Sequence, residues 1–346
     1  MTQLDFTALR HAAQREIDKG LVACQVAVAR DGDVVWTESF GDADDQSRFR
    51  VASATKPIVA SAVWLLIGDG LLDVTRPVAH YLPEFAANGK GQITVEQVLL
   101  MIAGFPSATM SLDDGADPER RRARMAAWEI EYEPGTKYVY HATSSHWVQA
   151  ELIERLSGTD FRDFVEQRVT TPLGLPRVLG IPRDEQQNIL GIDRAVVELP
   201  PDAVTIFRDS PRMVEVGVPG GGGAMSATTL ARFYQGLLNN PGGIWKPDVL
   251  RDATTNIRCT LPDPMFGMPA NRTLGVVIGN GFGVTWGASD TAFGWPGAGG
   301  QIGFAEPANG ISFAFLQHGD PDMNHTFGRS AKLSNLGLAL GQPEDC

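Results

Sequence analysis

The chain has 346 residues, and 29 basic against 41 acidic side chains give it a formal charge of −12. Hydrophobic residues make up 43% and charged residues 20%, which is typical of a globular protein and argues against a disordered chain. The acidic balance argues against a nucleic-acid or membrane-surface partner, because both require a basic face. The length suggests one large domain or two fused ones.

Cysteine usage and the N-terminus indicate the compartment. The three cysteines, Cys24, Cys259 and Cys346, are far apart and odd in number, which argues against a disulfide scaffold and a thiolate zinc site. The N-terminus has no basic patch followed by an apolar run, so no signal peptide is predicted. The longest apolar run, Ile58 to Ile67, is about half a membrane span. We therefore expect a cytoplasmic protein with no membrane partner.

The N-terminal part predicts a helix, a hairpin and a buried helix. Apolar residues recur at helical spacing over residues 5–19. Two Val-rich runs, Cys24 to Arg30 and Val34 to Phe40, flank Asp31-Gly32, a strong two-residue hairpin signal. Residues 54–69 are apolar almost all round, which is typical of a central, buried helix.

Helical patterns fill the middle of the chain, and strand patterns return at its end. Ser226 is expected to cap one of the helices, and Asn309-Gly310 is a second hairpin signal. The predicted helices are Pro118 to Trp128, His146 to Leu156, Ala227 to Leu238 and Asn324 to Leu340; the predicted strands are Leu274 to Ile278, Gly300 to Ala305 and Ile311 to Gln317.

The simplest assembly is an α/β (α+β) fold with a site between two parts. One antiparallel sheet, built from both termini and flanked by helices, would form a discontinuous domain of residues 1–75 and 266–346. Residues 76–265 would form a mostly helical domain, and the cleft between the two is the natural place for a binding site.

Ser53-Ala54-Thr55-Lys56 places a hydroxyl and an amine one helical turn apart at the start of the buried helix. Burial lowers the pKa of a lysine, so such a Lys could accept the Ser proton and produce a nucleophile. The alternative is a chance spacing, but a Lys is costly beside a buried helix unless it has a task.

Two further segments are ambiguous when taken alone. Tyr138 and Tyr140 follow Pro134-Gly135 and could carry a proton or could simply pack as aromatic residues. His141 could face the same site or be a solvated neighbour. The Gly-rich run from Phe293 to Phe304 opens a strand pair, where backbone N–H groups could bind an oxyanion or form only a bulge.

In this order, the segments resemble the serine β-lactamase-like family: class C β-lactamases, penicillin-binding DD-peptidases and, most closely, family VIII carboxylesterases. The resemblance extends from Asp31-Gly32 through Ser53-x-x-Lys56, Tyr140 and Gly220–Gly223 to Trp295-x-Gly297. It implies the β-lactamase-like fold, with Ser53 as the nucleophile that is acylated. It further implies Lys56 and Tyr140 as its catalytic partners, without deciding which is the base, and the backbone N–H groups of Ser53 and Ala298 as the oxyanion hole.

Two departures from the family pattern concern the substrate. Ala142 replaces the Asn of the Tyr-x-Asn motif, and Trp295 replaces the Lys that usually attracts a carboxylate. Losing such a charge-assisted contact costs ~1.5–3 kcal/mol. We expect an uncharged and fairly apolar ester, bound by Trp295, Gly297 and Phe105.

The resulting hypothesis is a serine carboxylesterase that needs no cofactor and no metal and acts on a small-molecule ester. A β-lactamase or DD-peptidase is the first alternative, and the missing Lys and Asn oppose it. An acyltransferase that uses the same acyl-enzyme is the second. A non-catalytic binding protein is opposed by the presence of Ser53, Lys56 and Tyr140. The sequence does not indicate the oligomeric state.

Overall fold

The computed structural model describes residues 4–192, 210–279, 289–320 and 323–340. Its main feature is a six-stranded sheet in which every pair of neighbouring strands is antiparallel. In spatial order the strands are β2 (Asp33–Gly41), β1 (Ala23–Arg30), β9 (Ile311–His318), β8 (Gln301–Glu306), β7 (Phe293–Gly297) and β6 (Val277–Ile278). The prediction of one antiparallel sheet built from both termini is confirmed.

The hairpin between β1 and β2 follows from its turn residues. Asp31 and Gly32 both have positive φ, 54° and 91°, which is the backbone of a type I′ turn. The second predicted hairpin, between β8 and β9, is also present, but four residues separate its strands instead of two. The predicted strand Leu274 to Ile278 is reduced to the two residues of β6.

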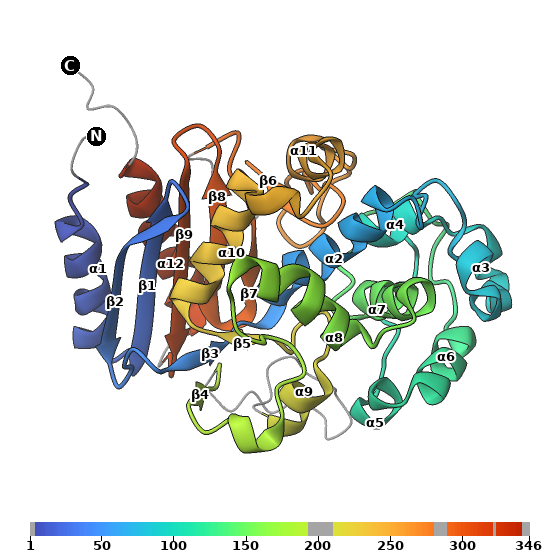
Figure 1. Cartoon of the computed structure of the whole chain (residues 1–346), viewed down its shortest axis with the longest axis horizontal. Helices are drawn as coiled ribbons and strands as arrows, with labels where there is room; N and C mark the ends of the chain where they lie inside the picture. The colour runs from blue at the N-terminus through green and yellow to red at the C-terminus, as the bar shows by residue number, and fades with distance from the viewer. Residues whose placement is uncertain (1–3, 193–209, 280–288, 321–322, 341–346) are drawn as a thin grey trace.

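Helices cover both faces of this sheet. On one face α1 (Thr7–Asp18) and α12 (Met323–Ala339) pack on large side chains such as Val26 and Phe315, which are opposite each other on β1 and β9. On the other face α10 (Ala227–Asn239) packs on small side chains, Ala27 and Ala29 among them. The alternation of large and small residues along β1 therefore gives each face its own core. Figure 1 shows α10 in front of the sheet and α12 behind it.

Helix α2 (Lys56–Gly68) joins the sheet to the helical part of the molecule. It is buried from Lys56 to Leu66, as its apolar sequence predicts. Two tryptophans fix it to distant segments, because Trp64 donates to the carbonyl of Leu274 at 2.7 Å and Trp245 donates to the carbonyl of Ser61 at 2.8 Å.

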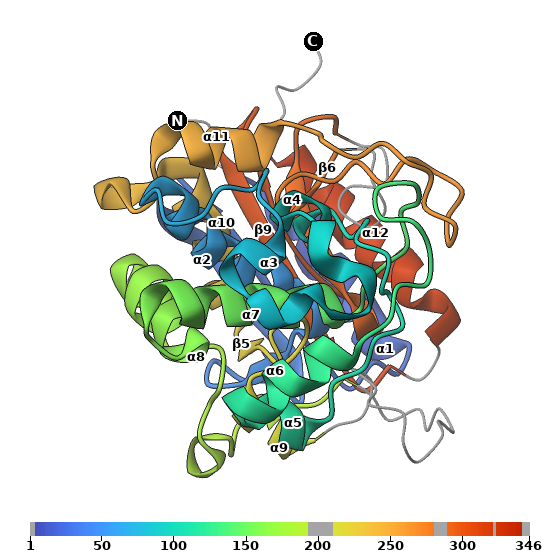
Figure 2. The ribbon, with the colours of Figure 1, turned by 90° about the vertical axis from the view of Figure 1, so that its right-hand side faces the viewer.

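The remaining helices gather beside the sheet, and Figure 2 shows them facing the viewer. They are α3 (Val78–Tyr81), α4 (Val95–Leu99), α5 (Leu112–Ala116), α6 (Pro118–Ala127), α7 (Ser144–Ser157), α8 (Phe161–Val165), α9 (Pro211–Val216) and α11 (Pro247–Thr255). A second, small sheet lies at their border, formed by β4 (Ile189–Leu190), β3 (Arg48–Arg50) and β5 (Ala224–Met225).

The division into two domains stays a prediction, and α10 lies across the predicted boundary. This helix belongs to the predicted helical segment 76–265, yet Gln235 donates to the carbonyl of Ala29 on β1 at 2.9 Å. Ser226 caps it as predicted, accepting from the backbone of Thr229. The layer that covers the sheet therefore includes a helix from the middle of the chain.

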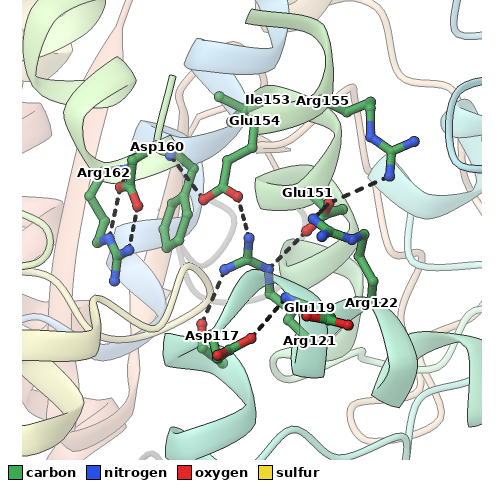
Figure 3. Close-up of polar contacts among 12 residues, drawn as sticks. Asp117, Glu119, Arg121, Arg122, Glu151, Ile153, Glu154, Arg155, Asp160 and Arg162 are labelled. Atoms are coloured by element: carbon green, nitrogen blue, oxygen red, sulfur yellow. Dashed lines mark hydrogen bonds and ion pairs between the residues drawn. The ribbon is translucent and has the colours of Figure 1, made fainter. Parts of the chain in front are cut away.

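A network of ion pairs holds α6 against α7 (Figure 3). The fully buried guanidinium of Arg121 on α6 contacts the carboxylates of Glu151 and Glu154 on α7. Arg122 and Arg155 also contact Glu151. Because α7 begins only four residues after Tyr140, this network anchors the helix that follows the predicted catalytic tyrosine.

Candidate active site

Ser53 lies on a short 3₁₀ turn, η1 (Ala52–Thr55), which leads directly into α2. The residue before it, Ala52, has a positive φ of 44°, an unfavourable backbone conformation for a residue with a side chain. Thr55 stabilises this turn: its hydroxyl donates to the carbonyl of Ala52 at 2.6 Å and accepts from the N–H of Gly223 at 3.0 Å. The serine hydroxyl is thereby held at the end of the buried helix.

Lys56 follows one turn later, and its side chain is completely buried. The amine contacts the hydroxyl of Ser53 at 3.2 Å and donates to the carbonyls of Ala142 at 2.7 Å and Gly220 at 2.6 Å. A Cβ at Gly220 would lie 2.9 Å from the Ala142 carbonyl, so glycine permits this close approach. All three N–H groups of an ammonium therefore have partners.

Tyr140 completes the cluster from a segment between α6 and α7. Its hydroxyl donates to that of Ser53 at 2.7 Å. The next residue, His141, is buried and anchors this segment by accepting from the N–H of Phe105 at 3.3 Å and contacting the carbonyl of Val139 at 2.6 Å. Burial lowers the pKa of His141 to about 4, which keeps the ring neutral. The alternative of a solvated histidine is wrong.

The electrostatics of the cluster lower the pKa values of both the amine and the phenol. Burial is the main cause that lowers the pKa of Lys56; the charge of Arg272 also lowers it, and Tyr140 opposes both. Burial raises the pKa of Tyr140, but the charge of Lys56, the hydrogen bonds with Ser53 and Lys56, and the charge of Arg272 outweigh it, so this pKa is lowered. The lowered pKa of Tyr140 favours its phenolate, whereas burial disfavours the ammonium of Lys56 and the neighbouring Tyr140 supports it.

A cavity of about 310 Å³ opens beside Ser53 and Tyr140. Its wall is mostly apolar, with Met265 and Phe327 exposed at 68% and 47%. The lining residues are Ser53, Tyr140, Asp263, Met265, Phe266, Arg272, Trp295, Pro296, Gly297, Ala298, Gly299, Thr326 and Phe327. The cavity can therefore take an apolar group next to the serine hydroxyl.

The end of β7 packs directly on the turn that carries Ser53. A Cβ on Gly297 would lie 2.3 Å from the carbonyl of Val51, so only glycine permits this contact. The contact brings Ala298, the next residue, to the cavity wall that Ser53 also lines. Participation of the Ser53 and Ala298 N–H groups in an oxyanion hole remains a prediction.

The structure brings together all the predicted site residues except one. Trp295, Gly297 and Ala298 line the cavity with Ser53 and Tyr140. The amine of Lys56 contacts the Ser53 hydroxyl and lies 5.1 Å from the ring centroid of Tyr140. Phe105, predicted to bind substrate, does not line this cavity; it is completely buried and stacks on Trp128 with ring centroids 5.7 Å apart. An apolar ring beside other aromatic rings gains more from the core than from a site wall.

Sequence reasoning missed several lining residues, above all Arg272. This arginine is 5% exposed, and its guanidinium carbon lies 4.1 Å from the ring centroid of Trp295. It stands alone in the sequence, with no motif around it, because its neighbours in space come from distant segments. Met265, Phe266 and Phe327 likewise carry no periodic signal.

Across the described residues, no group of three or more His, Cys, Asp or Glu side chains could hold a metal ion. None of the helices in the described ranges has the length and apolarity to cross a bilayer.

Comparison with known proteins connects this geometry to a family. Residues 9–334 match the family described as Beta-lactamase. The esterase/beta-lactamase LipL of Mycobacterium tuberculosis is 29% identical over 304 residues, which cover 78% of this chain and 68% of LipL. Esterase EstB of Burkholderia gladioli is 28% identical over 278 residues, covering 68% of this chain and 70% of EstB.

Solved structures agree over nearly the whole chain. A penicillin-binding protein homologue from Caulobacter crescentus has a TM-score of 0.81 at 25% identity and covers 97% of both chains. A family VIII carboxylesterase has a TM-score of 0.80 at 26% identity and covers 96% of this chain and 97% of that one. The β-lactamase-like fold predicted from the sequence is confirmed.

Proposed function

Because the chain belongs to the Beta-lactamase family, we propose that it is a serine carboxylesterase that hydrolyses uncharged, fairly apolar esters through an acyl-enzyme on Ser53. The observation that carries the proposal is the convergence of Tyr140 and Lys56 on the Ser53 hydroxyl, at 2.7 Å and 3.2 Å. The similarity to the esterase/beta-lactamase LipL and to the esterase EstB supports the ester as substrate.

Tyr140 is the proposed base. Lys56 commits two of its donors to carbonyls at 2.6–2.7 Å, an arrangement that suits a protonated amine with no lone pair for a proton. The Tyr140 phenolate, stabilised by this ammonium, takes the Ser53 proton while the serine oxygen attacks the ester carbonyl. Collapse of the tetrahedral intermediate expels the alkoxide, which receives the proton from Tyr140.

Deacylation repeats these steps with water. The regenerated phenolate removes a proton from water, which attacks the acyl carbonyl, and the phenol then returns the proton to the Ser53 oxygen. In both halves the negative oxygen of the intermediate would be bound by the N–H groups of Ser53 and Ala298.

The cavity wall supports a neutral, apolar substrate. Trp295, Phe266 and Met265 offer carbon surface to the acyl or alcohol group. Ala142 contributes its backbone carbonyl to Lys56 and has no amide that could bind a peptide-like side chain. The cavity volume of about 310 Å³ suits short acyl or alcohol groups. The cytoplasmic location remains a prediction from the sequence.

The test compares Ser53→Ala with Ser61→Ala, a buried serine of α2 whose hydroxyl donates to the carbonyl of Ile58 instead of lining the cavity. With p-nitrophenyl butyrate, Ser53→Ala should lose activity by ~10⁴-fold or more, whereas Ser61→Ala should retain it. Mass spectrometry of the wild type during turnover should show an acyl adduct on Ser53.

Three outcomes would contradict the proposal in different ways. Ester hydrolysis that survives in Ser53→Ala would show that Ser53 is not the nucleophile. Faster turnover of nitrocefin than of the ester favours a β-lactamase. Transfer of the acyl group to an added alcohol in preference to water favours the acyltransferase.

A further inference from the structure

Arg272 is a buried cation beside the proposed catalytic residues, and it has no counter-ion in the part of the chain that the structure describes. No carboxylate among the described residues lies within 4 Å of its guanidinium, although its side chain is almost fully enclosed. One nitrogen, Nη2, donates to the hydroxyl of Tyr138, while Nε and Nη1 have no hydrogen-bond partner within the described ranges. An enclosed guanidinium normally has carboxylate partners, so this exception calls for an explanation.

Two aromatic rings take the place of a counter-ion. The guanidinium carbon lies 4.1 Å from the ring centroid of Trp295 and 5.1 Å from that of Tyr138. Backbone pairing with Cys259 and Val277 fixes the residue itself beside the sheet. The faces of both rings attract a cation, which holds the guanidinium in place without neutralising its charge.

Two guanidinium nitrogens of Arg272, Nε and Nη1, are enclosed although the residue lines the cavity. Trp295, the ring against which the guanidinium stacks, lines the same cavity. Tyr140 is the next aromatic ring beyond Trp295, with ring centroids 6.3 Å apart. The ring of Trp295 therefore links Arg272 to Tyr140 in an enclosed region, in which electrostatic interactions are weakly screened.

We propose that Arg272 is a positioning residue of the esterase, whose buried charge stabilises the phenolate of Tyr140 while its stacking fixes Trp295 as a cavity wall. The proposal rests on the proposed function and adds a second cation to the Lys56 ammonium. With both cations in place, the phenolate persists at a pH where an isolated tyrosine is a phenol. The lowered pKa of Tyr140, to which Arg272 contributes, agrees with this geometry.

Apart from Lys56, the other charged and titratable groups around Tyr140 do not supply this effect. Asp263 is the carboxylate that lines the cavity among the described residues, and its negative charge works in the opposite sense. The buried histidines are held neutral by their lowered pKa values. The groups facing this region are Lys56 of α2, Tyr138 and His141 of the Tyr140 segment, His146 of α7, and Asp263 and Arg272 of the segment before β6.

The experiment measures the pH profile of kcat/KM with p-nitrophenyl butyrate for the wild type, Arg272→Gln, Arg272→Met and Arg272→Lys. Both neutral variants should move the acid limb upward by about one pH unit, the shift expected for one charge roughly 10 Å away at an effective dielectric constant near 20. Arg272→Lys should keep the limb within about 0.3 unit of the wild type because it keeps the charge. Gln retains a hydrogen-bond donor for Tyr138, and Met retains much of the side-chain volume. If only one of these two variants folds, that variant is enough for the test.

A second readout is the ultraviolet absorbance of the phenolate during a pH titration, with Tyr140→Phe subtracted. It should show the same upward shift in the neutral variants without any substrate present. An acid limb that stays in place in Arg272→Gln and Arg272→Met overturns the proposal, as does an equal shift in Arg272→Lys.

Direct binding of a substrate carboxylate by Arg272 would give a different pattern. In that case the neutral variants would raise KM for p-nitrophenyl hemiglutarate, an anionic ester, and leave the acid limb for the butyrate unchanged, which also overturns the proposal. Failure of the esterase proposal itself is separate, because it appears as activity that survives in Ser53→Ala, whatever the behaviour of the Arg272 variants.

Discussion

Arg121 and Arg272 are both enclosed arginines, but their surroundings differ completely. Arg121, between α6 and α7, contacts two carboxylates and donates to the carbonyl of Gly115. Arg272, at the cavity, has two aromatic rings and one phenol hydroxyl. In the helical region the buried charge is balanced by acids, and beside Ser53 it is not. A balanced charge joins two helices, whereas an unbalanced one remains available to act on a reaction.

The two enclosed lysines, Lys56 and Lys90, also differ in whether their partners are structural or belong to the candidate site, although the difference is smaller. Lys90 donates to the carbonyls of Ala87, Ala126 and Trp128, so its ammonium is committed to holding chain segments together. Lys56 also has two carbonyl partners, but its third contact is the hydroxyl of Ser53. Only the lysine beside the serine can influence a nucleophile.

The sharpest test of this contrast is Lys56→Met against Lys90→Met. We expect Lys56→Met to reduce kcat/KM for a p-nitrophenyl ester by about a thousandfold, because the proposed phenolate of Tyr140 loses its adjacent cation. Its free energy of unfolding should change by less than about 2 kcal/mol, since removing an uncompensated buried charge offsets the two unpaired carbonyls. Steady-state kinetics and urea denaturation measure the two quantities.

Lys90→Met should behave in the opposite way. It should lose about 1–3 kcal/mol of stability, because carbonyls are left without donors, and keep its kcat/KM within about twofold. Equal catalytic losses in the two variants would show that the effect of Lys56 is structural.

Arg121→Met should cause the largest loss of stability. It leaves Glu151 and Glu154 without their shared cation, and breaking an enclosed ion pair costs about 3–5 kcal/mol. Arg122, 3.2 Å from Glu151, remains to compensate in part, so we expect about 3 kcal/mol by urea denaturation. The activity per folded molecule should remain nearly that of the wild type.

The neighbouring residue provides the control for this prediction. Arg120 on the same helix forms an ion pair with Asp114 at 2.8 Å, but its side chain is 58% exposed. Because such pairs contribute at most about 1 kcal/mol, Arg120→Met should be nearly neutral. Comparable losses from both substitutions would contradict the distinction between balanced burial and surface pairing.

Local sequence patterns predicted most of the fold, because the residues of its main helices and hairpins themselves favour those conformations. Asp31-Gly32 accommodates positive φ at two successive positions, and α2 is apolar on every side. The small sheet could not be predicted, because strands of two or three residues have no periodicity. Phe49 on β3 pairs with Leu190 on one side and Met225 on the other, two contacts that are set by tertiary packing alone.

In the candidate site, too, residues that belong to local motifs were predicted and residues placed by tertiary packing were not. The predicted positions of Ser53, Lys56 and Tyr140 come from motifs, and the structure places them in contact. No motif predicted Arg272, because its role depends on contacts with Tyr138 and Trp295, which are distant in sequence. Trp295 stands at the sequence position where the family has a lysine, so the sequence indicated that this positive charge is lost. The structure places the guanidinium of Arg272 against the Trp295 ring, so a positive charge is still present nearby.

The smallest predicted effect tests whether the acids between α6 and α7 are themselves fully balanced. Burial is the main cause that raises the pKa of Glu154 above 4.5; Arg121 lowers it, while Asp160 and Glu151 add to the rise. A raised folded pKa favours the protonated acid, so its contribution to stability is complete below the unfolded pKa and is lost as the pH rises through the folded value. Glu154→Gln mimics the protonated acid and cannot titrate. Its stability relative to the wild type should therefore increase from pH 4.5 towards pH 7.

Urea denaturation of both proteins across this range measures the difference, and Glu119→Gln, which removes an exposed acid of α6, is measured in parallel as the control. The slope with pH is diagnostic, because any constant offset reflects only the altered hydrogen bond to Arg121. If Glu154→Gln instead loses stability relative to the wild type as the pH rises, the carboxylate is stabilised by its ion pair more than it is penalised by burial. Arg121 would then fully compensate the charges of both glutamates. The difference between this compensated arginine and Arg272 would be larger than the raised pKa of Glu154 indicates.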